Sequence, residues 1–80
     1  IHITCVPNPL SEQAVIYIDN SHSMPLYCDL YDHYGKKVWP KPTLITETKS
    51  IIINNLAIGI YYFSVTNLDA VRFIPIIVLK

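Results

Sequence analysis

The sequence contains little charge and no excess of either sign: Lys and Arg number six, Asp and Glu six, and charged residues make up 15% of the 80 residues. Nucleic-acid binding requires clustered basic residues, so this composition excludes a nucleic-acid partner. No apolar run approaches the roughly 18 residues that span a bilayer, so no transmembrane segment is expected. Apolar residues make up 51% of the chain, which is typical of a folded domain.

The chain is too short to build two hydrophobic cores. We therefore expect a single domain over residues 1–80. It opens at Ile1 without an initiator Met or the charged and apolar regions of a signal peptide. We interpret it as a piece of a larger protein.

Metal-ligand spacings are absent. Cys5 and Cys28 are the only cysteines and form no C-x-x-C pair, so they cannot build a tetrahedral zinc site. We interpret them as buried free thiols, with a disulfide as the alternative in an oxidising compartment. The three histidines lack the H-x-x-x-H spacing, and the acids do not follow a calcium loop. We expect no metal and no cofactor.

Catalytic patterns are missing as well. There is no G-x-S-x-G, and Cys28 and His33 belong to a strand and a turn rather than to a nucleophile and its base. The few acids fall mostly in turns or on outward faces, which does not favour a pair of catalytic carboxylates. We predict no catalytic residues and no enzyme activity.

The chain does contain short alternating apolar runs separated by turn residues. No run shows the apolar stripe of a helix. Seven short antiparallel strands predict an all-β, immunoglobulin-like antiparallel β-sandwich. The predicted strands are residues 1–6, 13–19, 24–31, 36–39, 51–53, 60–66 and 71–79.

In the third predicted strand, residues 24–31, successive side chains are expected to point to opposite faces of the sheet. Met24, Leu26, Cys28 and Leu30 are expected to point inward, and Tyr27, Asp29 and Tyr31 outward.

The last predicted strand, residues 71–79, contains a proline. Pro75 has no amide hydrogen to donate, so this strand should lie at a sheet edge or be bulged, or else begin only at Ile76.

Two further features concern tyrosine and tryptophan. Leu56, Gly59 and Tyr61 have the order of a tyrosine corner, in which a Tyr hydroxyl bonds to an upstream backbone group. The aromatic residues of the chain form either an outward platform for sugar rings or cross-strand packing pairs. These residues are Tyr17, Tyr27, Tyr31, Tyr34, Tyr61, Tyr62 and Trp39.

Four motifs occur in a fixed order along the chain. They are Val6-Pro7-Asn8-Pro9, Leu30-Tyr31-Asp32 leading to Gly35-Lys36-Lys37-Val38, Leu56 with Gly59-Ile60-Tyr61, and an apolar last strand ending in Lys80. Together they cover the whole chain, which resembles the C-terminal sorting domain of the type IX (Por) secretion system of Bacteroidota.

The resemblance implies a non-catalytic signal at the C-terminus of a larger cargo. Such a domain would fold in the periplasm, be recognised by the outer-membrane translocon and its processing protease, and leave the cargo at the cell surface or secreted. We expect the last strand to be recognised, through a free edge to which a partner strand can add. The candidate recognition residues are Ile76, Ile77, Val78, Leu79 and Lys80, and the expected scaffold residues are Pro7, Asn8, Pro9, Leu30, Asp32, Gly35, Leu56, Gly59 and Tyr61.

Two other functions remain open at this point. An immunoglobulin-like accessory module could bind carbohydrate or mediate adhesion, and a structural spacer would bind nothing.

Overall fold

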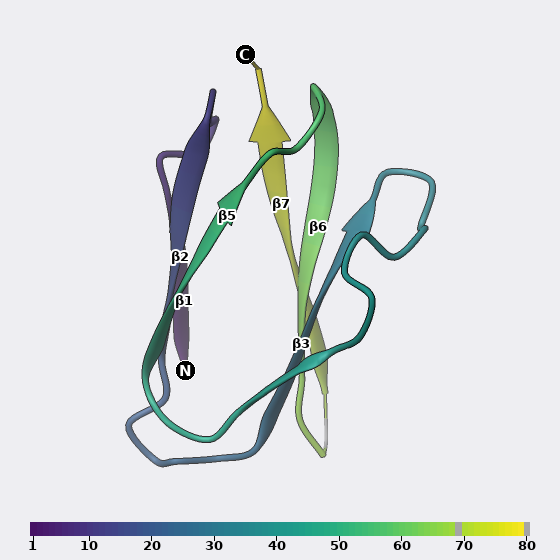
Figure 1. Cartoon of the computed structure of the whole chain (residues 1–80). Coiled ribbons are helices and arrows are strands. Elements are labelled where there is room, and N and C mark those ends of the chain that lie inside the picture. Colours follow the sequence, from purple (N-terminus) through teal and green to yellow (C-terminus); the bar gives the residue numbers. More distant parts are fainter. Residues whose placement is uncertain (69, 80) are drawn as a thin grey trace.

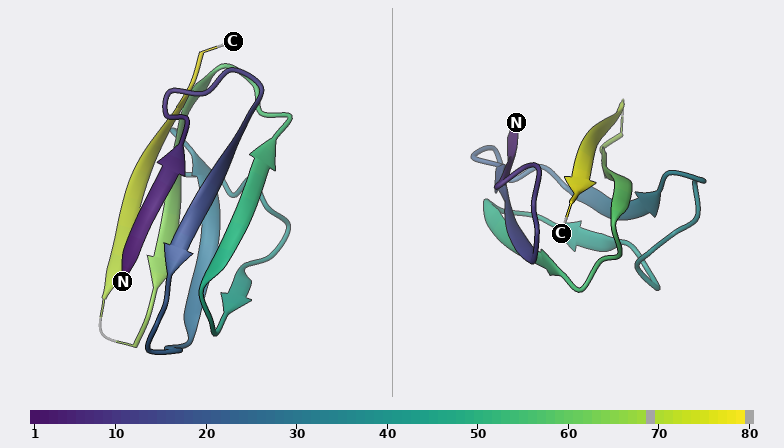
Figure 2. Two further views of the ribbon diagram at one scale, coloured as in Figure 1. Left: turned by 90° about the vertical axis from the view of Figure 1, so that its left-hand side faces the viewer. Right: turned by 90° about the horizontal axis from the view of Figure 1, so that it is seen from above.

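The computed structural model describes residues 1–68 and 70–79 and contains seven strands in two antiparallel sheets (Figure 1). One sheet has the order β1-β2-β5 and the other β4-β3-β6-β7, and the two lie face to face as layers (Figure 2). The predicted all-β sandwich of seven strands is confirmed. The strands are β1 (His2–Val6), β2 (Gln13–Asp19), β3 (Leu26–Asp32), β4 (Thr43–Ile45), β5 (Lys49–Asn54), β6 (Gly59–Thr66) and β7 (Val71–Val78).

The core lies between the layers and follows from the alternation of apolar residues. Every second residue of β2 and β6 is buried, because successive side chains of a strand point to opposite faces. Phe63 of β6 is fully buried, and the ring of Trp39 packs edge-on against it with centroids 5.9 Å apart. The buried apolar residues are Leu10, Ala14, Ile16, Ile18, Leu26, Cys28, Leu30, Ile45, Ile53, Tyr61, Phe63, Val65, Ile76 and Val78.

The strand predicted at residues 36–39 is wrong. Gly35 closes a tight turn by donating to the Asp32 carbonyl at 3.0 Å, with the positive φ (83°) expected of it. The returning chain forms only an isolated bridge to β3, and Trp39 then turns inward onto the core. β4, which is not among the predicted strands, pairs with β3 instead.

The inward placement of Met24 is also wrong, since this residue is 38% exposed. The buried Asn20 side chain donates to the Met24 carbonyl at 2.8 Å and accepts from the Met24 amide at 3.1 Å. These two bonds close a loop, and β3 begins only after it, at Leu26.

Asp29 points away from the core as predicted, but it is only 4% exposed. Its Oδ1 accepts from the Leu30 amide at 2.9 Å, and the Lys37 Nζ lies 3.4 Å from its Oδ2. The alternation of the strand predicted the correct face for Asp29. It could not show that the Lys37 side chain lies beside the Asp29 carboxylate.

β7 is an edge strand, as Pro75 predicted, but it pairs with β6 from Val71 onward, so the alternative start at Ile76 is wrong. The Pro75 carbonyl points to the outer edge, where it accepts a bond from Asn8. Because the amide and carbonyl of one residue in an antiparallel strand point to the same side, the missing Pro75 N–H costs no bond to β6.

The tyrosine corner is confirmed. The Tyr61 hydroxyl donates to the Ala57 carbonyl at 2.8 Å, and Gly59 between them has φ 153°. A side chain would strain Gly59, because residues with a Cβ rarely adopt this φ.

Replacing Tyr61 with Phe removes that partly buried hydrogen bond. We expect a loss of about 0.5–1.5 kcal/mol in the free energy of unfolding, measured by thermal denaturation. Tyr27→Phe, at an exposed ring on the same sheet, should leave the melting temperature unchanged. Equal melting temperatures for the two variants would contradict a stabilising role for the corner.

Candidate recognition site at the end of the last strand

The outer edge of β7 is closed near its C-terminal end by the segment Pro7–Leu10, which we call the edge-closing segment. The Asn8 Nδ2 donates to the Pro75 carbonyl at 2.9 Å, and the Asn8 Oδ1 accepts from the Ile77 amide at 3.1 Å. A carboxamide offers a donor and an acceptor in one plane, as a peptide group does. Asn8 therefore takes the place that a neighbouring strand would occupy.

Leu10 continues this pairing with its backbone. Its amide donates to the Ile77 carbonyl at 2.8 Å, and its carbonyl accepts from the Leu79 amide at 2.8 Å, which makes a parallel bridge to Val78. The Leu10 side chain is buried in the core. Together with Asn8, these bonds pair the outer edge of the last strand from Pro75 to Leu79.

The closed edge changes what the last strand offers to a partner. Ile76 and Val78 are buried in the core, whereas the side chains of Ile77 and Leu79 are exposed. Lys80 lies outside the described residues. A partner strand cannot add to this stretch while the edge-closing segment is in place, because the backbone groups are already paired. Recognition here would rest on side chains.

The expected scaffold residues occupy three structural features. Pro7, Asn8 and Pro9 belong to the edge-closing segment, Asp32 and Gly35 to the turn after β3, and Gly59 and Tyr61 to the corner. Leu30 is buried, and Leu56 packs against the core from a partly buried position. In the turn, the Asp32 Oδ1 accepts from the amides of Tyr34 and Lys36, both at 2.9 Å.

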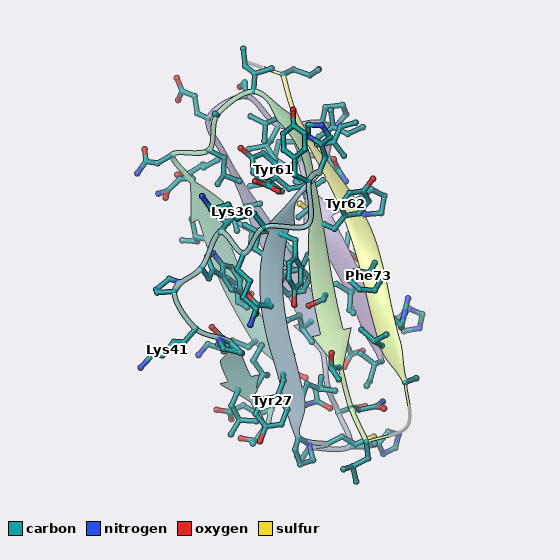
Figure 3. The ribbon with its side chains drawn as sticks, turned by 90° about the vertical axis from the view of Figure 1, so that its right-hand side faces the viewer. Tyr27, Lys36, Lys41, Tyr61, Tyr62 and Phe73 are labelled. Atoms are coloured by element: carbon teal, nitrogen blue, oxygen red, sulfur yellow. The ribbon has the colours of Figure 1, made fainter. Side chains whose placement is uncertain are left out.

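The aromatic residues do not form one platform. Tyr27, Tyr31 and Tyr62 lie on the outer face of the four-stranded sheet, and Figure 3 shows Tyr27 and Tyr62 there with Phe73, which sequence reasoning missed. Tyr61 and Trp39 pack in or against the core instead. Tyr17 lies on the outer face of the other sheet, and Tyr34 is exposed in the turn.

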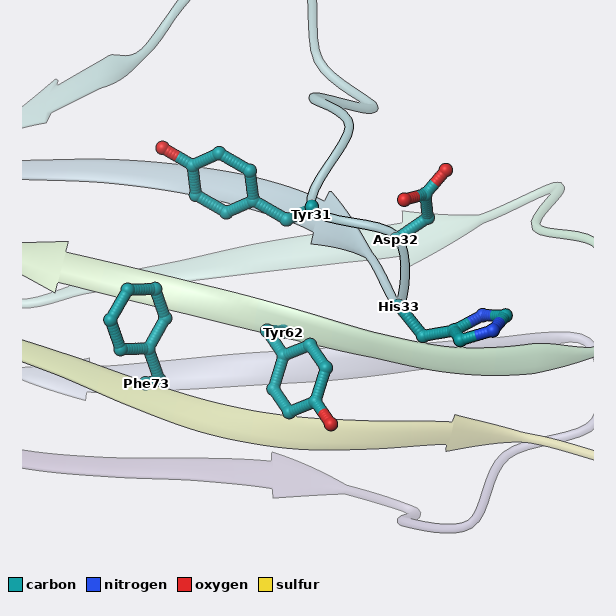
Figure 4. A pocket seen from close by; sticks show the side chains of 6 residues that line it. Tyr31, Asp32, His33, Tyr62 and Phe73 are labelled. Carbon is teal, nitrogen blue, oxygen red and sulfur yellow. The ribbon is translucent and has the colours of Figure 1, made fainter.

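An open groove of about 530 Å³ lies on this outer face (Figure 4). Tyr31 and Phe73 stand on either side of β6, with ring centroids 6.4 Å apart, and Tyr62 lies beside them. Asp32 and His33 line the end of the groove near the turn. The rings make it an apolar groove.

The described residues were compared with what a metal site or a reactive thiol requires. Within residues 1–68 and 70–79, no three His, Cys, Asp or Glu side chains come together as a metal site. Cys5 and Cys28 are free thiols; burial raises the pKa of Cys5, and burial raises the pKa of Cys28 to about 11. Because the thiolate is the reactive form, neither thiol is activated near neutral pH. No helix in the described chain is long and apolar enough to cross a membrane.

The fold and the site define a small sandwich domain whose first loop closes the edge of its last strand. The family described as the secretion system C-terminal sorting domain matches residues 4–79, which is nearly the whole chain, and the chain belongs to this family. It is a sorting signal for type IX secretion, which directs export to the cell surface or the medium through the type IX machinery. No curated protein and no solved structure matches the chain.

The family consists of sorting signals and not of catalytic domains. Neither the match nor the fold supports the carbohydrate-binding alternative.

Proposed function

We propose that residues 1–80 form the single C-terminal domain of a larger cargo protein, which folds in the periplasm. The outer-membrane translocon recognises this domain there, and its processing protease acts on the cargo upstream. One observation supports the proposal: Asn8 and Pro75, which are 67 positions apart, are joined by a hydrogen bond, so the opening motif and the last strand form one surface.

Within that surface we assign different roles to alternate residues of the last strand. Ile76 and Val78 anchor the strand in the core, and Ile77 and Leu79 present apolar side chains outward. Lys80 adds a positive charge next to them in the sequence. Because the backbone edge is closed, a translocon subunit would contact the exposed side chains and the terminal charge.

Recognition through exposed side chains can be tested without disturbing the core. Deleting residues 76–80 would remove two core side chains and unfold the domain, so that lost export would have no single cause. Replacing both Ile77 and Leu79 with Ser changes only exposed side chains. The full-length cargo with this double substitution should accumulate in the periplasm, measured by cell fractionation and immunoblotting.

The matched control is Ile52→Ser, at an exposed apolar residue of β5 in the other sheet. Cargo carrying it should reach the surface as the unsubstituted cargo does. Circular dichroism of the isolated chains should show the same strand content for both variants. Normal surface display of the Ile77 and Leu79 double variant would exclude recognition through these side chains.

A further inference from the structure

The outer face of the four-stranded sheet carries apolar side chains on all four of its strands. In register, Leu44 lies beside Tyr27, Tyr31 beside Tyr62, and Ile60 beside Ile77. We call this surface the aromatic face. Its residues are Leu44, Tyr27, Tyr31, Ile60, Tyr62, Val71, Phe73, Pro75 and Ile77.

The aromatic face is large for a chain of this size. Phe73 is 57% exposed and Tyr27 54% exposed. With roughly 200 Å² for each aromatic side chain, and somewhat less for each aliphatic one, the exposed fractions leave on the order of 600 Å² of apolar surface. That is the upper end of the largest patch on a monomer, about 300–600 Å². It is also close to the roughly 800 Å² that each partner buries in a standard interface.

The face carries little charge to oppose a partner. Asp29 is buried and paired with Lys37, and Asp32 lines only the end of the groove near the turn. Ser64 and Thr66 are the polar neighbours on β6. Lys36 and Lys41 lie to the side of the sheet (Figure 3).

The outer face of the other sheet differs. There polar residues interrupt the apolar ones: Ser50 lies beside Tyr17, Asn54 beside Gln13, and His2 beside Asp19. Its apolar residues, Val6, Val15, Tyr17 and Ile52, are fewer than those of the aromatic face, so the larger apolar surface lies on the four-stranded sheet.

These properties fit a second copy of the same chain. A twofold axis through the aromatic face would place apolar rows against apolar rows, and flat sheets pack face to face at about 10 Å. The formal net charge of the chain is zero, so two copies do not repel each other at long range. The groove between Tyr31, Tyr62 and Phe73 offers room for a side chain of the second copy.

We propose that the aromatic face is a self-association surface on which a second copy of this chain docks, forming a reversible dimer. The aromatic face shares Ile77 with the proposed recognition residues of the last strand, so the test uses Phe73, which is not one of them. The proposal concerns association in solution, whereas the proposed function concerns export, so either can fail without the other.

Sedimentation velocity of the 80-residue chain at pH 7, from about 1 µM to about 1 mM, tests the proposal over the range in which weak interfaces associate. The sedimentation coefficient should rise from that of a monomer to that of a dimer. Phe73→Ser should weaken the dimer about tenfold or more, since buried aromatic residues dominate interfaces. Tyr17→Ser, at a 51% exposed ring on the opposite face, should leave it unchanged.

Two results would overturn the proposal. The first is a monomer at every concentration, and loss of export of the full-length cargo on Phe73→Ser would then assign the aromatic face to the export machinery. The second is a dimer that Phe73→Ser and Tyr17→Ser affect equally. Circular dichroism should confirm that both variants keep the fold, as expected for exposed positions.

Discussion

Replacing Phe63 with alanine is expected to leave much of the domain unfolded at physiological temperature. Phe63 is fully buried at the centre of β6, and the Trp39 ring packs against it. Truncation of a buried Phe costs about 3–5 kcal/mol, from lost burial and from the cavity that remains. A domain of 80 residues has about 4–12 kcal/mol of stability in total. The melting temperature should therefore fall by roughly 15–30 °C.

Phe73→Ala makes the same chemical change at an exposed ring of the same sheet. It should change the free energy of unfolding by no more than about 0.5 kcal/mol, provided that the protein concentration keeps the chain monomeric. Denaturant titration followed by Trp39 fluorescence measures both variants. A small effect of Phe63→Ala, or equal effects of the two, would mean that the core is not centred on Phe63.

The second large effect is expected from Asn8→Asp. The new side chain cannot donate, so the Pro75 carbonyl loses its partner and instead faces a carboxylate oxygen. The bond from the Ile77 amide can persist, because it needs only an acceptor. The bond is exposed, so water can solvate the freed carbonyl, and its loss should cost about 0.5–1.5 kcal/mol. Hydrogen exchange at the Ile77 and Leu79 amides should accelerate by about two- to tenfold.

Asn55→Asp is the matched control for this prediction. Asn55 has φ 57° in an exposed loop, a conformation that Asp tolerates as well as Asn does. The variant should keep the exchange rates of Ile77 and Leu79. If Asn8→Asp left those rates unchanged, the Asn8 side chain would not be holding the end of β7.

Local pattern was sufficient to predict most of the strands. β2 and β6 were predicted within one residue, because period-two alternation has one solution when one face is buried. The corner was predictable because Gly59 and Tyr61 carry it within five residues of Ala57.

Residues 36–39 could not be assigned by the same reasoning. Their alternation is compatible with a strand. In the fold the ring of Trp39 packs on Phe63, and this stretch pairs with β3 only through the isolated bridge at Lys37. Which segment pairs with the edge of β3 depends on the folded core, and β4 is placed there.

The candidate site was the least predictable part. The bonds of Asn8 and Leu10 to β7 join positions 67 to 69 residues apart, and no local periodicity reports such contacts. Phe73 was missed as a surface residue for a related reason. Phe73 is exposed because no segment among the described residues covers the outer face of the four-stranded sheet.

The edge-closing segment also makes the conformation of residues 75–79 depend on the folding of the rest of the chain. Loop-closure entropy grows with the length of chain between two contacting segments, so pairing residues 8–10 with residues 75–79 is favourable only once the intervening strands are in place. A copy that is truncated at its start, or only half folded, would present a bare strand edge of the kind that promotes aggregation. Any factor that binds residues 75–79 in their paired conformation therefore distinguishes a fully folded domain from a truncated or partly folded one.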